Sequence, residues 1–205
     1  MLFRSLLPGD RIAVEDPCFL GSLNVLAAGG HAVLPVAMDA HGMQVEALRV
    51  ALEAGARAVL LTPRAHNPTG ASLDAKRARA LRQLLAGYPQ VAVLIDDHYA
   101  LLSQQPYHSV LPDDGRRWAL LRSLSTALGP DLRLAWLGCD AGTASVLRLR
   151  LPAGTGWASH LPQAAATAVL ESAPQRATLT PAGARYQQRL PPSPDRPLAP
   201  RLPPP

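Results

Sequence analysis

Residues 58–70 read Ala-Val-Leu-Leu-Thr-Pro-Arg-Ala-His-Asn-Pro-Thr-Gly, an apolar run that passes directly into turn-forming residues. A short apolar run bounded by turn residues is typical of a strand buried on both faces of a parallel sheet. The Asn67-Pro68-Thr69-Gly70 segment is typical of the turn that follows such a strand. This stretch therefore predicts an α/β fold with polar residues at the end of a central strand.

Apolar runs like that of residues 58–62 recur along the chain, with helical patterns between them. Further strands are predicted at residues 12–14, 32–36 and 91–95, and helices at 21–28, 45–54 and from a cap at Ser72 to about residue 85. Strands that alternate with helices form a mainly parallel sheet covered on both faces. The predicted fold class is therefore a three-layer α/β/α architecture with a mostly parallel sheet.

Two more strands are predicted at residues 118–124 and 133–138. The link between them is too short for a helical crossover, so we expect one of the two strands to run antiparallel. Further helices are predicted at residues 147–151 and 157–172.

The composition of the 205-residue chain limits its class. Apolar residues make up 48%, enough for a packed domain, but no apolar run reaches the ~20 residues that span a bilayer. Two cysteines, Cys18 and Cys139, and no signal-peptide pattern favour the cytoplasm. The net charge is +5 without a basic stripe, so we expect neither nucleic-acid nor membrane binding through this chain.

The sequence changes character after residue 172. From Pro181 to Pro205, nine of 25 residues are proline and the apolar periodicity is lost. Burial in such a segment cannot offset its ordering entropy. We therefore expect one domain over residues 1–172 and a proline-rich, disordered tail over residues 173–205.

Four polar segments follow predicted strands: residues 15–19, 63–70, 96–99 and 123–133. Ligands of open α/β sheets bind beyond the carboxyl ends of the strands, so these segments are candidates for one shared site. Each also has an ordinary structural explanation, such as helix capping by Asp96 and Asp97. A metal site of Asp96, Asp97 and His98 is a weaker alternative, because consecutive residues at a strand end point in different directions.

The order of these segments resembles that of class I/II aminotransferases, the pyridoxal-phosphate (PLP) dependent enzymes of fold type I. The resemblance rests on Asn67-Pro68-Thr69-Gly70, on the Asp96-x-x-Tyr99 spacing, and on the Ser123–Arg133 loop. It covers about residues 2–172. Residues 64–70, 95–99 and 128–133 are most similar to the effector domain of MocR-type (GntR-like) transcriptional regulators, in their PtsJ-like branch.

The resemblance implies that seven residues bind the cofactor: Phe19, Asn67, Asp96, Tyr99, Ser123, Ser125 and Arg133. Asp96 would pair with the pyridine nitrogen and keep it protonated, so that the ring acts as an electron sink. Asn67 and Tyr99 would bind the ring 3-oxygen, with His98 as an alternative to Tyr99. Phe19 would stack on the ring. The two serines and Arg133 would bind the phosphate, for which a planar guanidinium is suited.

Thr126 stands where the family carries its Schiff-base lysine. A hydroxyl can neither form an imine nor shuttle a proton as that amine does, so we expect no catalytic residue in this chain. The single lysine, Lys76, is expected on the surface of the helix after Ser72. The expected ligand is therefore noncovalent PLP or a related vitamin B6 compound, with an amino-acid-like molecule as a second candidate.

The family also implies segments that we do not recognise in this chain. They are a phosphate-binding turn upstream of Leu2, a C-terminal small domain with its substrate-binding arginine, and the winged helix of MocR-type regulators. We therefore expect a truncated domain from a family that is usually homodimeric.

Three functions remain open from the sequence. The favoured one is a catalytically inactive, cofactor-sensing effector domain of a MocR-type regulator, or its remnant. The second is an active PLP-dependent aminotransferase that moves amino groups between amino acids and 2-oxo acids. The third is a non-functional fragment.

Overall fold

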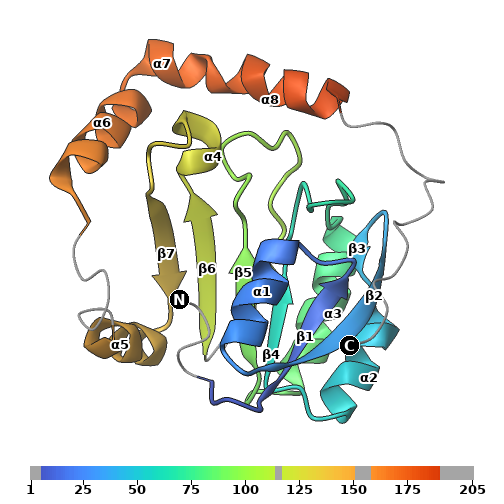
Figure 1. Cartoon of the computed structure of the whole chain (residues 1–205). Coiled ribbons are helices and arrows are strands. Elements are labelled where there is room, and N and C mark those ends of the chain that lie inside the picture. Colours follow the sequence, from blue (N-terminus) through green and yellow to red (C-terminus); the bar gives the residue numbers. More distant parts are fainter. Residues whose placement is uncertain (1–5, 114–116, 151–157, 190–205) are drawn as a thin grey trace.

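The computed structural model describes residues 6–113, 117–150 and 158–189 (Figure 1). Its strands are β1 (Arg11–Asp16), β2 (Ala32–Asp39), β3 (Gly42–Met43), β4 (Ala58–Leu61), β5 (Ala92–Asp96), β6 (Trp118–Ser123) and β7 (Ala135–Cys139). Its helices are α1 (Leu20–Ala28), α2 (Val45–Glu53), α3 (Ala75–Ala86), α4 (Ser125–Leu128), α5 (Ala141–Arg150), α6 (His160–Glu171), α7 (Ala173–Ala177) and α8 (Leu179–Arg189).

The strands form one sheet in the order β3-β2-β1-β4-β5-β6-β7. The five central strands run parallel, whereas β3 is antiparallel to β2 and β7 is antiparallel to β6. The mostly parallel sheet and the antiparallel strand after β6 are thus confirmed. The two-residue strand β3 was not predicted, because so short a segment carries no periodicity.

Helices cover both faces of the sheet, as predicted (Figure 1). On one face, α1 places Leu26 against Ile12, Val14 and Leu60 of the central strands. On the other face, α2 and α3 pack Leu48 and Leu81 into a second cluster. All four residues of β4 are buried, which explains its uninterrupted apolar sequence.

Two helix starts differ from the prediction. Asp74, not Ser72, caps α3, and its Oδ1 accepts a hydrogen bond from the Arg77 amide at 2.6 Å. The Ser72 hydroxyl instead accepts from the Ala65 amide at 2.9 Å. The helix predicted at 147–151 begins earlier, at Ala141, because Oδ1 of Asp140 accepts from the Thr143 amide at 2.9 Å.

The prediction of a disordered tail from residue 173 is wrong for residues 173–189, which form α7 and α8. Pro174 and Pro181 both lie in the first turn of a helix, where the missing N–H costs no hydrogen bond. Residues 190–205 lie outside the described part of the chain. Among the described helices, none has the length and hydropathy needed to span a membrane.

Candidate functional site

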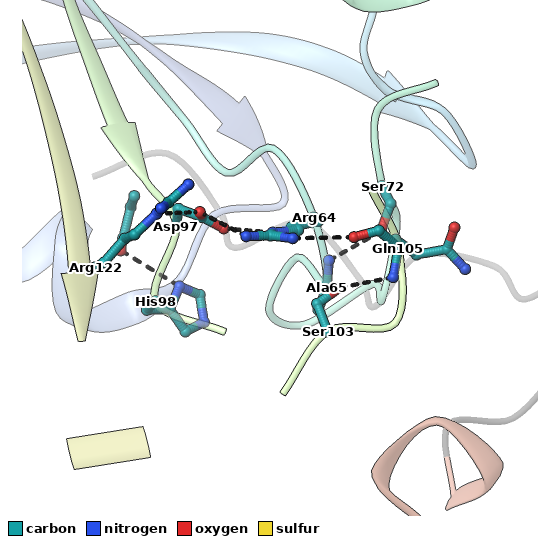
Figure 2. A network of polar contacts seen from close by, with 9 residues as sticks. Arg64, Ala65, Ser72, Asp97, His98, Ser103, Gln105 and Arg122 are labelled. Atoms are coloured by element: carbon teal, nitrogen blue, oxygen red, sulfur yellow. Dashed lines mark hydrogen bonds and ion pairs between the residues drawn. The ribbon is translucent and has the colours of Figure 1, made fainter. Parts of the chain in front are cut away.

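A single buried carboxylate, Asp97, joins two arginines at the carboxyl end of the sheet (Figure 2). Arg64 donates from Nε to Oδ1 at 2.7 Å and from Nη2 to Oδ2 at 3.0 Å. Arg122 donates from Nε to Oδ2 at 2.9 Å, and Asp97 is 0% exposed. Tyr107 lies beside both guanidinium groups, with its ring centroid 5.7 Å from Arg64 Cζ and 5.2 Å from Arg122 Cζ.

This Asp97 network connects three segments that carry predicted site residues. Arg64 precedes Asn67 by three residues, Asp97 follows Asp96, and Arg122 precedes Ser123. Arg64 also donates from Nη1 to the carbonyl oxygen of Gln105 at 3.0 Å. The network therefore fixes the ends of β4, β5 and β6 relative to one another.

Asp96 presents a buried oxygen that accepts no hydrogen bond from the described residues. Its Oδ1 has no hydrogen-bond partner in the described part of the chain, although His98 Nδ1 lies 3.4 Å away. His98 Nδ1 is also buried without a hydrogen bond, and the His98 ring packs on Tyr99 with centroids 4.6 Å apart. A buried acceptor of this kind is costly unless a ligand or water completes it.

A cavity of about 500 Å³ lies beyond the ends of β4 and β5. Its walls include Asn67 and Tyr99, two of the seven predicted cofactor residues. Gly183 and Tyr186 of α8 close one side, and Figure 1 shows α8 at the same end of the sheet as α4. A Cβ at position 183 would overlap the Leu102 carbonyl oxygen, so glycine allows α8 to approach this closely.

The structure does not bring the other five predicted residues, Asp96 included, to the walls of this cavity. Phe19 lies at the N-cap of α1 with 49% of its surface exposed, Ser123 ends β6, and Arg133 is exposed. The Ser125 hydroxyl donates to the Leu132 carbonyl at 2.5 Å, so it closes its own loop.

The two residues that bear on catalysis lie apart from each other. Thr126 is half-buried in α4, and Lys76 is exposed in α3, as the sequence indicated for Lys76. Among the described residues, no three His, Cys, Asp or Glu side chains are grouped to hold a metal ion. Asp97, one of the three considered for such a site, is already bound by two guanidinium groups.

Two buried titratable residues beneath Asn67 were not singled out from the sequence. Glu15 and His66 are each 3% exposed, with Glu15 Oε2 3.4 Å from His66 Nε2. Burial raises the pKa of Glu15 to about 8 and lowers the pKa of His66 to about 4. Their spacing fits an ion pair, but burial penalises both charges, so the two groups face each other uncharged at neutral pH.

These two pKa shifts predict a pH-dependent stability. Folded Glu15 keeps its proton up to about pH 8, whereas the unfolded chain loses it near pH 4.5. Folded His66 stays neutral down to about pH 4, whereas the unfolded chain protonates it near 6.5. As the pH rises from 4.5 to 6.5, Glu15 lowers the stability of the fold while His66 raises it, so the two effects oppose each other. Above pH 6.5 only the loss of stability from Glu15 remains.

We expect the free energy of unfolding, measured in urea, to fall by about 2 kcal/mol as the pH rises from 6.5 to 8. Glu15→Gln cannot titrate and should abolish this slope. An equal slope in both proteins would show that another group causes it.

The sequence carried a weak signal for these residues. Glu15 follows the apolar run of β1, and a charged residue there is either paired or shifted in pKa. Its partners, Thr62 and His66, lie about fifty residues further on, so only the parallel pairing of β1 with β4 brings them together.

Comparisons with known proteins bear on the family and the fold of the chain. The family profile described as aminotransferase class I and II matches residues 1–190. The vitamin B6 salvage pathway transcriptional repressor PtsJ of Salmonella typhimurium is 58% identical over 163 residues, which are 80% of this chain and 38% of that protein. The HTH-type transcriptional regulator TauR of Rhodobacter capsulatus is 33% identical over 146 residues, 69% of this chain and 29% of its own length.

The kynurenine aminotransferase of Pyrococcus horikoshii, solved with PMP, superposes with a TM-score of 0.79 at 23% identity. The match covers 92% of this chain and 49% of that structure, and it supports the fold alone. The chain thus spans well under half of the two regulators and about half of this enzyme.

Proposed function

The chain belongs to the aminotransferase class I and II family, and from this premise we propose that it is a pyridoxal-phosphate-binding effector domain without transaminase activity. PLP is the cofactor of this family, and the 58% identical relative is a regulator named for vitamin B6 salvage. The proposed role is to bind PLP, or a related vitamin B6 compound, as a signal. An amino-acid-like molecule is the second candidate ligand.

One observation carries the proposal: at the carboxyl end of β5, Asp96 Oδ1 is a buried acceptor to which none of the described residues donates a hydrogen bond. A protonated pyridine nitrogen supplies the single N–H that such an oxygen requires. This acceptor therefore fits the ring nitrogen of the cofactor. When bound, PLP would supply an electron-withdrawing ring, and Asp96 would hold the proton on its nitrogen.

Other residues of this chain would orient the ring and its phosphate. Asn67 and Tyr99 already share one cavity and would bind the ring 3-oxygen. Exposed Phe19 would cover one ring face, since an aromatic side chain stacks well on a pyridine. Ser123, Ser125 and Arg133 would bind the phosphate, for which the Ser125 hydroxyl would have to leave the Leu132 carbonyl.

The absence of a lysine at position 126 argues against turnover. Thr126 has no amine to bind a carbonyl carbon, and Lys76 lies exposed on α3. Binding without turnover suits a sensor. Both cysteines are free, which agrees with a regulator domain that works in the cytoplasm, and we expect it to form homodimers as its family does.

PLP titration, followed by absorbance and by borohydride reduction with intact-mass measurement, tests this function. We expect saturable binding and no covalent adduct. Asp96→Asn should weaken binding about 10- to 100-fold, the range for losing one hydrogen bond to a charged group.

His41→Asn, a change at the exposed ion pair with Asp74, is the matched control and should bind like the unmodified chain. A stoichiometric adduct on the unmodified chain would contradict the loss of covalent chemistry. Absence of saturable binding would favour a remnant without cofactor affinity.

A further inference from the structure

Glu15 and His66 hold a chain of hydrogen bonds beneath the segment that carries Asn67, here called the Asn67 loop (residues 62–74). Glu15 Oε2 accepts from the Thr62 amide at 2.8 Å and lies 3.4 Å from His66 Nε2. His66 Nδ1 lies 2.9 Å from Thr69 Oγ1, and that same oxygen accepts from the Ala71 amide at 3.2 Å. One carboxyl group on β1 thereby connects the start, middle and end of the loop.

The backbone of the loop closes around the same histidine. The His66 amide donates to the Ala71 carbonyl at 2.9 Å, and the Gly70 amide donates to the His66 carbonyl at 2.6 Å. Asn67 lies inside this closed turn and follows His66 directly, so a shift of the histidine moves the asparagine. The Asn67 side chain is exposed, and no hydrogen bond from the described residues holds it in place.

Both groups are uncharged at neutral pH, so the 3.4 Å contact between Glu15 Oε2 and His66 Nε2 joins a carboxylic acid to a neutral imidazole. In one tautomer the acid donates to Nε2 and His66 donates from Nδ1 to the Thr69 hydroxyl, and in the other tautomer both donors are reversed. Other titratable groups lie near the pair. The charge of Asp96 raises the pKa of Glu15, and the charge of Glu15 raises the pKa of Cys18. The charge of His98 lowers the pKa of His66. Glu15 Oε1 remains buried without a hydrogen bond in the described residues.

We propose that Glu15 and His66 form a buried positioning pair that holds Asn67 for the 3-oxygen of the cofactor ring. The inference rests on the proposed PLP-binding function for its purpose, but the ordering of the loop can be measured without cofactor. Neither residue touches the cofactor in this proposal. They act through Asn67.

Hydrogen exchange of the unliganded protein tests the ordering step. In Glu15→Leu, which removes the acceptor for the Thr62 amide and the carboxyl group beside His66, we expect the amides of His66, Gly70 and Ala71 to exchange at least about tenfold faster. Glu15→Gln keeps an acceptor oxygen and resembles the protonated acid, so its loop should exchange like the unmodified protein.

The matched control is Leu26→Ala in α1. Leu26 is fully buried against Ile12, Val14 and Leu60 on the α1 face of the sheet, in a different cluster from Ala13 and Leu61, and its carbonyl accepts from the His31 amide. This variant should lose stability without faster exchange in the loop. Equal loop exchange in Glu15→Leu and the unmodified protein would overturn the proposal, as would equal acceleration in Leu26→Ala.

PLP titration of the same variants tests whether the ordered Asn67 loop supports PLP binding. Glu15→Leu and His66→Phe should bind roughly tenfold more weakly, the scale for residues that orient a ligating group. Glu15→Gln should bind within about twofold at pH 7 and, unlike the unmodified chain, should not lose further affinity above pH 8.

Two failures remain distinguishable. If the unmodified chain does not bind PLP, the proposed function fails, and the positioning proposal falls with it whatever the loop exchange shows. If the unmodified chain binds PLP and Glu15→Leu binds equally well, only the positioning proposal is overturned.

Discussion

Replacing Asp97 with alanine is expected to lower the free energy of unfolding by about 3–5 kcal/mol, the range for breaking a buried ion pair from one side. The carboxylate is fully buried and accepts three hydrogen bonds from Arg64 and Arg122. Without it, the Arg64 side chain, which is 10% exposed in the unmodified protein, would keep its hydrogen bond to the Gln105 carbonyl but lose its carboxylate partner. Arg122 contributes less, because it is 34% exposed and water can solvate it. Urea denaturation at pH 7 measures the change.

The Asp97 change should also weaken cofactor binding, because the Asp97 network connects the segments of Asn67, Asp96 and Ser123. Asp113→Ala is the matched control, since Asp113 pairs with Arg82 at 3.6 Å with its side chain 98% exposed. No measurable loss is expected there. A similar small loss at both positions would mean that the Asp97 network does not hold the three strand ends together.

The fold could be predicted because burial leaves a direct record in the sequence. Strands such as β4 and β5 are buried on both faces and contain only apolar residues before a polar end. The short link after β6 required a reversal of direction, which β7 shows. By contrast, the helices at residues 173–189 were hidden by prolines, whose effect depends on their position within a helix turn.

The site could be predicted only in part. The strand ends pointed to the segments of Asn67 and Tyr99, which line one cavity, because ligands gather at the carboxyl edge of a parallel sheet. The roles of Asn67, Asp96 and Tyr99 rest on the family resemblance and stay predictions. The Asp97 network depends on pairs separated by 33 and 25 residues, and no local pattern records such pairs. Asp97 was considered only as a helix cap or a metal ligand, although two arginines occupy it.

The second large effect concerns the position of the absent lysine. We expect Thr126→Lys to convert noncovalent binding into a covalent adduct with PLP, which borohydride fixes as a mass increase of one cofactor per chain. The substitution adds a primary amine, which can bind the cofactor's aldehyde carbon where a hydroxyl cannot do so stably. Thr126 lies on α4, which follows β6. The Asp97 network fixes the end of β6 beside the end of β5, where Asp96 lies.

Ala127→Lys is the matched control, because Ala127 is the next residue of α4 and is also half-buried. Its amine leaves the helix in a direction about 100° away, so it should not react at stoichiometric level. Lys76 is common to both variants, and peptide mapping separates any reaction there. Equal adducts on both variants would mean that the reaction reports exposure and not position. Saturable binding by Thr126→Lys without an adduct would mean that residue 126 does not face the cofactor, and the assignment of the lysine position would be wrong.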